Sequence, residues 1–467
     1  MTRTATPTRH RGHSVIITGQ RLTAGLHGSR GVSGINPGRA RNNGASRISV
    51  QKYGGSSLAT VDQLHQVARR VTDTYNTGRP TVVVVSARGH TTDELLRLAD
   101  TTGRTRSGRE TDQLLATGEG ASAALLAIAL QDLGVPAISL TGAQAGIRAA
   151  GKHGSGVIAD IDTRRLQRIL AGGEVAVVTG FQGVADTGDV VTLGRGGSDT
   201  TAVAIAAVLR AGSCEIYTDV PGIATADPRI VENARFLPAV DVGVMAEMSF
   251  AGAKVLHSRC VELAARHHVE LHIRSSKEDR SVTPGTIIPA GSDGAMLENH
   301  GVVVAIAHDL DVARVSVQCR SRRNDLAADI LAVLYEQAVP VDLVARSGPQ
   351  EDDFRMSFTM GRKDSEKTLV ALQEKMAGLD ATVHVDKNVG KLSLIGMGLL
   401  NRPEYTARML SALAAAGIPT SWLSTSQIRT SVVIPADRVV SAVRLLHDEF
   451  ELEHDGLVPV SAGSAGR

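Results

Sequence analysis

The chain has 467 residues, which is too long for one ordinary hydrophobic core and predicts two or three domains. Its apolar fraction of 42% and charged fraction of 21% are normal for a globular protein. A formal net charge of +2 and an aromatic content of 3% argue against a nucleic-acid-binding surface. The three cysteines have no paired spacing, and no apolar run approaches a membrane span. We therefore expect a cytoplasmic protein without nucleic-acid or membrane partners.

Residues 1–46 differ in composition from the rest of the chain. They contain seven arginines and no acidic residue, and they show no sustained apolar period. This composition predicts a disordered basic extension. Three interpretations stay open for it: an inert tail or over-long gene start, a targeting peptide, or a nucleic-acid-binding arm. The predicted strand that begins near Arg47 favours the first.

Residues 47–283 alternate short β-branched runs with amphipathic helical stretches. The predicted strands are residues 48–51, 81–86, 137–140, 175–179 and 215–218. The predicted helices are residues 61–76, 91–101, 120–133, 164–171 and 202–209. This alternation predicts an α/β domain with a mainly parallel sheet sandwiched by helices. In such sheets, ligands bind beyond the carboxyl ends of the strands.

Residues 284–300 are predicted to be a linker, since Pro and Gly are frequent at its start. Beyond it, the pattern strand–helix–strand–strand–helix occurs twice, in residues 301–388 and 389–467. Val315 and Leu392 occupy matching strand positions in the two copies. The repeat predicts a duplicated ferredoxin-like unit. Such a pair behind a larger domain serves as a sensor, as a dimerisation platform, or as both.

Two glycine-rich segments precede predicted helices, and the first of them lies at a predicted strand end. The first is residues 51–57, where Lys52 precedes Gly54, Gly55 and Ser56. The second is residues 193–201, where Arg195, Gly196 and Gly197 precede two predicted N-cap residues, Ser198 and Asp199. Glycines let backbone amides approach phosphate oxygens, and a lysine can reach them as a point charge. Each segment alone fits an ordinary capped turn. Together they predict a binding site for the phosphate groups of a nucleotide.

Two further segments carry weaker signals. Residues 217–229 join a strand end to a turn-rich loop, and residues 249–257 contain Lys254. Taken alone, the first reads as a surface loop and Lys254 as a surface charge.

With these segments in place, the sequence resembles the aspartate kinases, particularly the actinobacterial type regulated by lysine and threonine. The resemblance runs from about Ile48 to the C-terminus, with the matching stretches in family order. These stretches are VQKYGGSSL, TTDELLRLA, LLATGE, GFQGV, LGRGGSDTTAVA, CEIYTDV, TADPRIVENAR and GAKVLH. The resemblance implies an amino acid kinase domain, a carbamate-kinase-like three-layer αβα sandwich, followed by two ferredoxin-like ACT domains.

The resemblance also implies roles for individual residues. Lys52 and Asp199 would be catalytic, the lysine neutralising and the aspartate orienting the transferring phosphoryl group. The implied aspartate-binding residues are Thr92, Glu119, Arg195, Gly196, Gly197 and Ser198. The implied nucleotide-binding residues are Lys52, Tyr53, Gly54, Gly55, Ser56, Thr218, Asp219, Ala224, Arg229 and Lys254.

The implied reaction is phosphorylation of the L-aspartate side-chain carboxylate by ATP to give 4-phospho-L-aspartate. That carboxylate is already a nucleophile near neutral pH, so positioning and electrostatics suffice without a general base. Mg²⁺ is expected with ATP, because two cationic side chains cannot balance the phosphates. The protein itself shows no metal-ligand motif. Lysine and threonine would be effectors at the ACT domains, and the ACT domains would form a homo-oligomer.

The nucleotide and substrate regions depart from the family pattern in places. Pro221 stands where the family usually has Asp, and Ala224 where it has Tyr. Residues 86–90 read Ser-Ala-Arg-Gly-His in place of Ser-Ala-Met-Gly-Asp. We expect altered nucleotide binding without loss of activity, since Lys52 and both glycine loops remain.

The predicted regulatory half departs more. The family's Asp-x-Pro-Gly turn has no counterpart in residues 319–325, and Arg346-Ser347 replaces the usual Gln-Asn. In the second unit, Arg402-Pro403-Glu404 replaces a His-Pro-Gly turn. Replacing Gly by Glu404 closes a backbone approach, which predicts weakened feedback inhibition. The alternative is that effectors still bind through shifted side chains.

Two rival functions remain at this point. One is a kinase for a related acidic amino acid in specialised metabolism, since one methylene changes binding by only about 1–3 kcal/mol. The other is an inactive amino-acid-binding pseudo-kinase, which Lys52, Asp199 and Arg195 argue against.

Overall fold

A seven-stranded sheet forms the centre of the N-terminal domain. The computed structural model describes residues 48–103, 107–253, 255–278, 285–291, 302–320, 325–347 and 354–454. The sheet has the order β13-β12-β9-β1-β2-β6-β3, and its strands are parallel except for β13. Its members are β1 (Ser49–Tyr53), β2 (Thr81–Val85), β3 (Ala137–Leu140), β6 (Val175–Thr179), β9 (Ser213–Thr218), β12 (Glu270–Ser275) and β13 (Thr286–Ile288). The parallel strands bring their carboxyl ends to one edge, as the sequence predicted.

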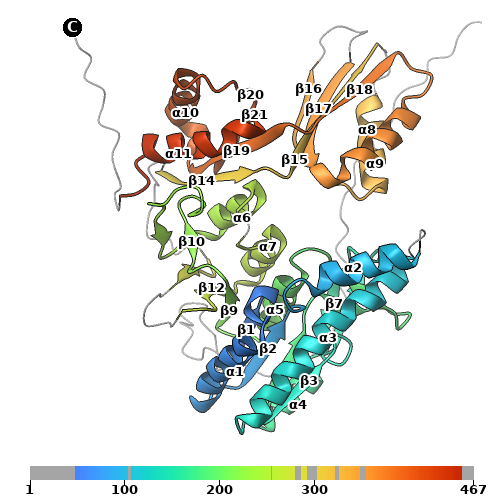
Figure 1. The fold of residues 1–467 in the computed structure, drawn as a ribbon, viewed down its shortest axis with the longest axis vertical. Helices are drawn as coiled ribbons and strands as arrows, with labels where there is room; N and C mark the ends of the chain where they lie inside the picture. The colour runs from blue at the N-terminus through green and yellow to red at the C-terminus, as the bar shows by residue number, and fades with distance from the viewer. Residues whose placement is uncertain are drawn as a thin grey trace, which may run out of the picture. The chain divides into compact units, whose positions relative to one another are not determined.

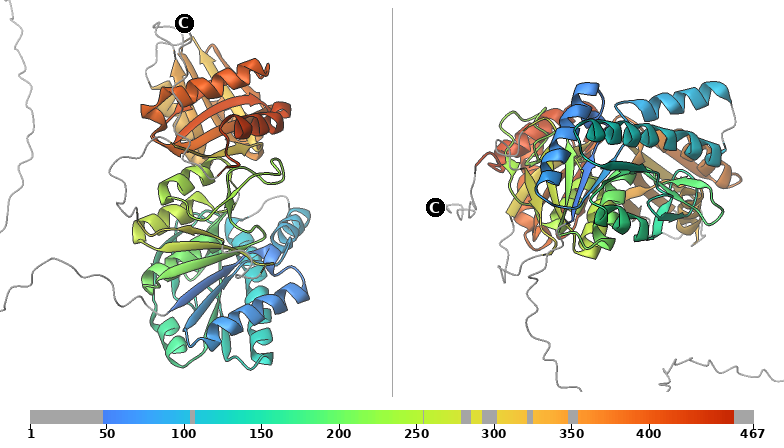
Figure 2. Two further views of the ribbon diagram at one scale, coloured as in Figure 1. Left: turned by 90° about the vertical axis from the view of Figure 1, so that its left-hand side faces the viewer. Right: turned by 90° about the horizontal axis from the view of Figure 1, so that it is seen from below.

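Helices cover both faces of this sheet, which makes three layers (Figures 1 and 2). One face packs against α1 (Val61–Asn76) and α3 (Gly108–Asp132). The other packs against α4 (Arg164–Ala171), α5 (Gly197–Val208), α6 (Val242–Ala251) and α7 (Ser258–His267). All five residues of β2 are buried, because both of its faces are covered. This explains why the inner strands read as continuous β-branched runs.

Two smaller sheets and one further helix complete this domain. One sheet has the order β5-β4-β7-β8, and β10 pairs with β11 in a hairpin. Helix α2 (Thr91–Thr102) packs beside α3. The strands of these sheets are β4 (Ile147–Ala150), β5 (Val157–Ile161), β7 (Gln182–Val184), β8 (Val190–Thr192), β10 (Ile223–Ala224) and β11 (Phe236–Leu237).

Helix α3 begins twelve residues earlier than the predicted start at residue 120. Its first three turns contain polar and glycine residues, which hide the helical period. By length and composition alone, α3 is also apolar enough to cross a membrane, but half of its most apolar stretch is buried in the domain. Core helices of soluble proteins pass the same test, and the packing of α3 against α1 and the sheet identifies it as one.

The C-terminal half contains the predicted pair of ferredoxin-like units (Figure 1). The first unit has the sheet order β16-β17-β15-β18, with two helices on one face. Its elements are β15 (Val312–Cys319), α8 (Leu326–Glu336), β16 (Val341–Ser347), β17 (Phe354–Gly361), α9 (Ser365–Lys375) and β18 (Ala381–Asp386). The second unit continues with β19 (Val389–Met397), α10 (Pro403–Ala415), β20 (Ser421–Thr425), β21 (Arg429–Pro435) and α11 (Val439–Glu449).

The second unit takes its fourth strand from outside the second repeat. Strand β14 (Val302–Asp309) precedes the first unit in sequence, yet it pairs antiparallel with β19, from Val302 opposite Met397 to Asp309 opposite Lys391. The predicted boundary that assigned residues 301–388 to the first unit is therefore wrong. The predicted linker of residues 284–300 also begins too early, because β13 belongs to the large sheet. The N-terminal extension lies outside the described residues.

A buried charged cluster joins the N-terminal domain to both ferredoxin-like units. Lys391 on β19 is 4% exposed, and its ammonium bonds to Asp342 on β16 (2.9 Å) and to the carbonyl of Phe250 on α6 (3.3 Å). Arg429 on β21 donates two bonds to Asp342 and pairs with Glu247 on α6 at 3.1 Å. Burial opposes ionisation of Asp342, but these two cations hold its pKa below the ordinary value.

Gly252, at the end of α6, lies very close to the backbone of β14. Its φ is 122°, and an added Cβ would lie 2.1 Å from the carbonyl oxygen of His308. We expect Gly252→Ala to destabilise the protein by about 3 kcal/mol or more, since backbone must move. The control is Gly134→Ala, which shares a positive φ but meets no atom within 4 Å. It should cost about 1 kcal/mol. Equal melting temperatures for the two variants would contradict the close approach.

Candidate functional site

An ion pair joins the two glycine-rich loops at the carboxyl edge of the sheet. Lys52, in β1, lies with its Nζ 2.6 Å from Oδ1 of Asp199, in the first turn of α5. Their side chains are 11% and 13% exposed. A lysine held beside a carboxylate and still open to solvent can balance a transferring phosphoryl group. The structure thus brings together the two residues predicted to be catalytic.

The first loop needs glycine at position 55 for close packing. A Cβ on Gly55 would lie 2.5 Å from the carbonyl oxygen of Ala87, and the amide of Gly89 donates to Gly55 (2.9 Å). A Cβ on Gly54 would lie 3.5 Å from Nζ of Lys52. Ser56 is exposed in the following 3-10 turn. The backbone of this loop therefore borders the ion pair.

The second loop enters α5 differently from the prediction. Ser198 and Asp199 were expected at the N-cap, but the N-cap is Gly196, with φ 70°, and both residues lie inside the first turn. The left-handed conformation of Gly196 supplies the turn, so no side-chain cap is used. A Cβ on Gly196 would lie 2.3 Å from Cβ of His257. The early start turns Asp199 toward Lys52.

Glu119, on α3, is a buried carboxyl group with one free oxygen. It is 3% exposed, its Oε1 accepts a bond from the amide of Ala87 (3.0 Å), and its Oε2 has no hydrogen-bond partner. Burial raises the pKa of Glu119 to about 7, although the bond from Ala87 lowers it. A buried carboxylate with an unused oxygen is suited to a cationic ligand group.

The other predicted substrate residues range from exposed to buried. Arg195 is exposed, and Thr92 is half-buried in the first turn of α2. Ser198 is buried against Gly180, where an added Cβ would approach its side chain to 2.6 Å. Gly197 packs against Phe181. An exposed guanidinium at the entrance can pair with a carboxylate in two bonds.

Asp112 anchors the second loop, and sequence reasoning missed it. It is 1% exposed and accepts bonds from the amides of Gly154 (3.0 Å) and Thr192 (2.9 Å), from the Thr192 hydroxyl (2.6 Å), and from His153 (3.0 Å). Asp112 lies seven residues before Glu119, two turns along the same face of α3. That spacing was the available signal.

His257 and Arg259 support the same loop from α7, and they were also missed. His257 caps α7 by accepting from the amide of Arg259 (3.3 Å). Arg259 donates to the carbonyls of Leu193 (2.6 Å) and Gly156 (2.8 Å). Burial lowers the pKa of both side chains. In the sequence, His257 stands out only as the last residue of the GAKVLH stretch.

The predicted nucleotide residues divide into three groups. Thr218 is the last residue of β9 and Asp219 follows it. Both lie next to the first loop, because the amide of Gly54 donates to the carbonyl of Tyr217 (3.4 Å). Ala224 lies in β10, and exposed Arg229 pairs with Asp227 (2.7 Å) on the following loop. Lys254 lies outside the described residues.

Tyr53 requires a correction, since its side chain cannot contact a nucleotide. It is 0% exposed, its ring stacks on Tyr217 at 4.6 Å, and its hydroxyl donates to Gln51 (3.1 Å). Tyr53 points under the sheet edge because alternate residues of a strand face opposite ways. Only its backbone borders the loop.

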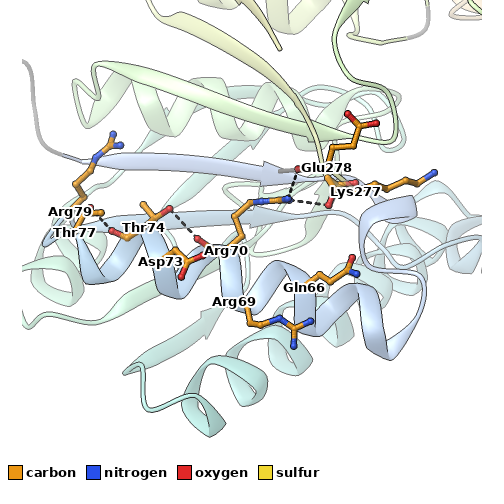
Figure 3. Close-up of a pocket in the computed structure, with 10 residues that line it drawn as sticks. Gln66, Arg69, Arg70, Asp73, Thr74, Thr77, Arg79, Lys277 and Glu278 are labelled. Atoms are coloured by element: carbon orange, nitrogen blue, oxygen red, sulfur yellow. Dashed lines mark hydrogen bonds between the residues drawn. The ribbon is translucent and has the colours of Figure 1, made fainter. Parts of the chain in front are cut away.

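A cavity of about 650 Å³ lies elsewhere, beside α1 and the end of β12 (Figure 3). Arg70 donates there to the carbonyls of Ser276 (3.0 Å) and Glu278 (2.9 Å). The side chains of Arg69 and Arg79 point away from each other in Figure 3, so they do not converge on one ligand. Neither Lys52 nor Asp199 lines this cavity. Within the described ranges, no cluster of three His, Cys, Asp or Glu side chains is arranged to hold a metal ion.

Comparison with known proteins identifies the families of both halves of the chain. Residues 47–275 match the amino acid kinase family, and residues 392–450 match an ACT domain. The chain is 44% identical over 423 residues to an aspartokinase of Mycolicibacterium smegmatis, which covers 89% of this chain and 99% of the relative. An aspartokinase of Geobacillus stearothermophilus is 41% identical over 408 residues, or 87% of this chain and 98% of the relative.

A solved structure shares the fold over most of its length. The aspartate kinase of Synechocystis has a TM-score of 0.68 and 28% identity, covering 89% of this chain and all of that one. Its likeness includes both halves of the chain, so the order of kinase domain and ACT domains is shared as well. The chain belongs to the aspartokinase family.

Proposed function

We propose that the edge of the sheet between Lys52 and Asp199 is where the phosphoryl group is transferred, with the flanking residues in the roles given below. As a member of its family, the chain transfers a phosphoryl group from ATP to the side-chain carboxylate of L-aspartate. The observation that carries the assignment of the site is the 2.6 Å ion pair that joins both glycine loops. A related acidic substrate and a pseudo-kinase have no observation in their favour.

Lys52 neutralises charge as it spreads over the transferring group, and Asp199 holds the Lys52 ammonium in place. The backbone amides of Gly55 and Ser56 bind phosphate oxygens, and Gly54 leaves space beside Lys52 because it has no side chain. The attacking carboxylate is ionised at neutral pH, so rate acceleration comes from orientation and electrostatics.

Glu119 binds the ammonium group of aspartate through its free oxygen, and Arg195 binds the α-carboxylate. Thr92 and Ser198 complete this side with their hydroxyl groups, beside the backbone of Gly196 and Gly197. The ammonium compensates the buried Glu119 charge, which supports this assignment.

Thr218, Asp219, Arg229 and Lys254 contact the nucleotide, together with the backbone at Tyr53 and Ala224. Mg²⁺ accompanies ATP in this proposal, held mainly by phosphate oxygens as is usual for this ion. Asp199, between the two loops, would offer the ion a carboxylate oxygen. The ion would add neutralising charge to the phosphates.

Lysine or threonine is the proposed effector at the ACT domains. The same domains are the proposed contact surface of a homo-oligomer. Arg402 and Pro403 begin α10, and Glu404 pairs with Arg402 at 3.5 Å. The turn of the first ACT domain lies partly outside the described residues. All three cysteines are buried and none forms a disulfide, which suits the reducing cytoplasm.

Lys52→Ala should lower aspartate-dependent ADP release at least about 100-fold, because transition-state charge loses its counter-ion. The assay uses purified protein with Mg²⁺-ATP and L-aspartate, with L-glutamate as the second substrate. Lys375→Ala, which removes another lysine paired with an aspartate (3.4 Å), is the control and should keep full activity. Equal turnover with glutamate, or an active Lys52 variant, would contradict the proposal.

The KM for aspartate should rise about tenfold between about pH 8 and about pH 6, because Glu119 must be ionised to bind the ammonium. Glu119→Gln should have a high KM at both pH values. Its folded-state pKa lies above the ordinary value of 4.5, so ionisation of Glu119 destabilises the fold at neutral and higher pH. The variant should therefore melt no lower than the original at about pH 8. A pH-independent KM in the original would remove Glu119 from the substrate site.

Lysine and threonine should inhibit weakly, since Glu404 stands where a Gly would leave backbone amides open. Titration of both amino acids into the ADP-release assay measures this. The matched variant is Glu404→Gly, which should strengthen inhibition. Clear inhibition of the original chain at low-millimolar effector would contradict the expectation.

A further inference from the structure

The loop of residues 225–235 connects β10 to β11 and contacts two domains. On its exposed side it presents Arg229, whose side chain is 83% exposed. Asp227 raises the pKa of Arg229 by a hydrogen bond and by its charge, and the charge of Asp219, which follows β9, adds to the effect. The opposite side of the loop is buried in the second ACT domain. Residues Ala226 and Val231, 5% and 4% exposed, belong to that domain's hydrophobic core.

Hydrogen bonds fix the backbone of this loop to the second ACT domain. The amide of Ile306, on β14, donates to the carbonyl of Thr225 (2.8 Å). Nε of Arg444, on α11, donates to the carbonyl of Ile230 (2.8 Å). The loop therefore follows the ACT domain if that domain shifts, since buried apolar contacts and backbone bonds hold it there.

His447, on α11, makes the central side-chain contact. It is 0% exposed, and its Nε2 lies 3.0 Å from Oγ1 of Thr225, which is also fully buried. Oγ1 of Thr225 in turn accepts a bond from the amide of Arg235 at the other end of the loop (3.0 Å). One hydroxyl therefore ties both ends of the loop to His447. Burial lowers the pKa of His447, so its ring is neutral at pH 7.

We propose that His447 is a positioning residue for the nucleotide, acting through Thr225 on the loop that presents Arg229. Through this contact the second ACT domain sets the nucleotide affinity of the kinase domain. The inference rests on the proposed nucleotide role of Arg229. It extends that role, because it assigns to an ACT-domain side chain an effect on ATP that does not pass through an effector.

A merely structural role for His447 predicts a different result. If the side chain only stabilised α11, its loss would lower the melting temperature and leave both substrates bound as before. If it positions the loop, its loss weakens nucleotide binding and spares the aspartate site, because Glu119 and Arg195 lie on other elements.

The experiment measures ADP affinity by calorimetric titration, and KM for ATP and aspartate by ADP release. His447→Leu removes the polar contact at similar volume, while His447→Gln can restore a polar atom near the Nε2 position. Ser431→Ala is the matched control, because it breaks a buried 2.8 Å bond to Ser393 within the same ACT domain. Arg444→Met removes the exposed bond to Ile230 with little risk to folding.

His447→Leu should weaken ADP binding and raise the KM for ATP at least fivefold, which corresponds to about 1 kcal/mol. The KM for aspartate should stay within twofold. His447→Gln and Ser431→Ala should bind ADP within twofold of the original, and Arg444→Met should weaken it at least twofold.

Unchanged ADP affinity in His447→Leu overturns the inference. If His447→Leu does not fold, unchanged affinity in Arg444→Met overturns it. Equal weakening in Ser431→Ala also overturns it, since general destabilisation would then explain the effect. Absence of aspartate-dependent turnover in the original chain is a separate result: it removes the proposed function, while the ADP titrations still decide the role of His447.

Discussion

The ion pair between Lys52 and Asp199 is the interaction on which the site depends. Lys52 lies where the first glycine-rich loop leaves β1 of the parallel sheet, and Asp199 lies at the end of the second loop, which follows β8 of the smaller sheet. A partly buried lysine is costly without a counter-charge, so the pair holds the two loops together. Asp112 and Arg259 support this arrangement by bonding to the strand and loop that lead into α5.

Sequence predicted most of the fold, because the buried strands and amphipathic helices have strong local patterns. The strand 175–179 and the helix 61–76 match the structure residue for residue. Pairing between distant segments has no such pattern, so the place of β14 could not be foreseen. The same limit applied to the site. Lys52 and Glu119 carry motifs, whereas Asp112 acts through contacts that only the folded chain creates.

The charged cluster around Asp342 lies where the kinase domain contacts both ACT domains. Lys391 and Arg429 both lie 5.2 Å from the ring centre of Phe250, and both bond to Asp342. A buried pair of this kind adds little net stability, but removing one partner leaves an uncompensated charge. The cluster therefore determines how the three domains are oriented at their contact, and it contributes less to the stability of that contact. Glu247 and Phe250 belong to α6, so the cluster lies on the helix that ends at Gly252.

The position of β14 has a consequence for how the chain is made. During synthesis, β14 leaves the ribosome about 80 residues before β19, its neighbour in the sheet. The whole first ACT domain emerges in between, as an insertion between two adjacent strands. The second ACT domain, and with it the buried side of the 225–235 loop, must therefore form last. A nascent chain halted before residue 389 would carry a kinase domain whose 225–235 loop lacks its support from the second ACT domain.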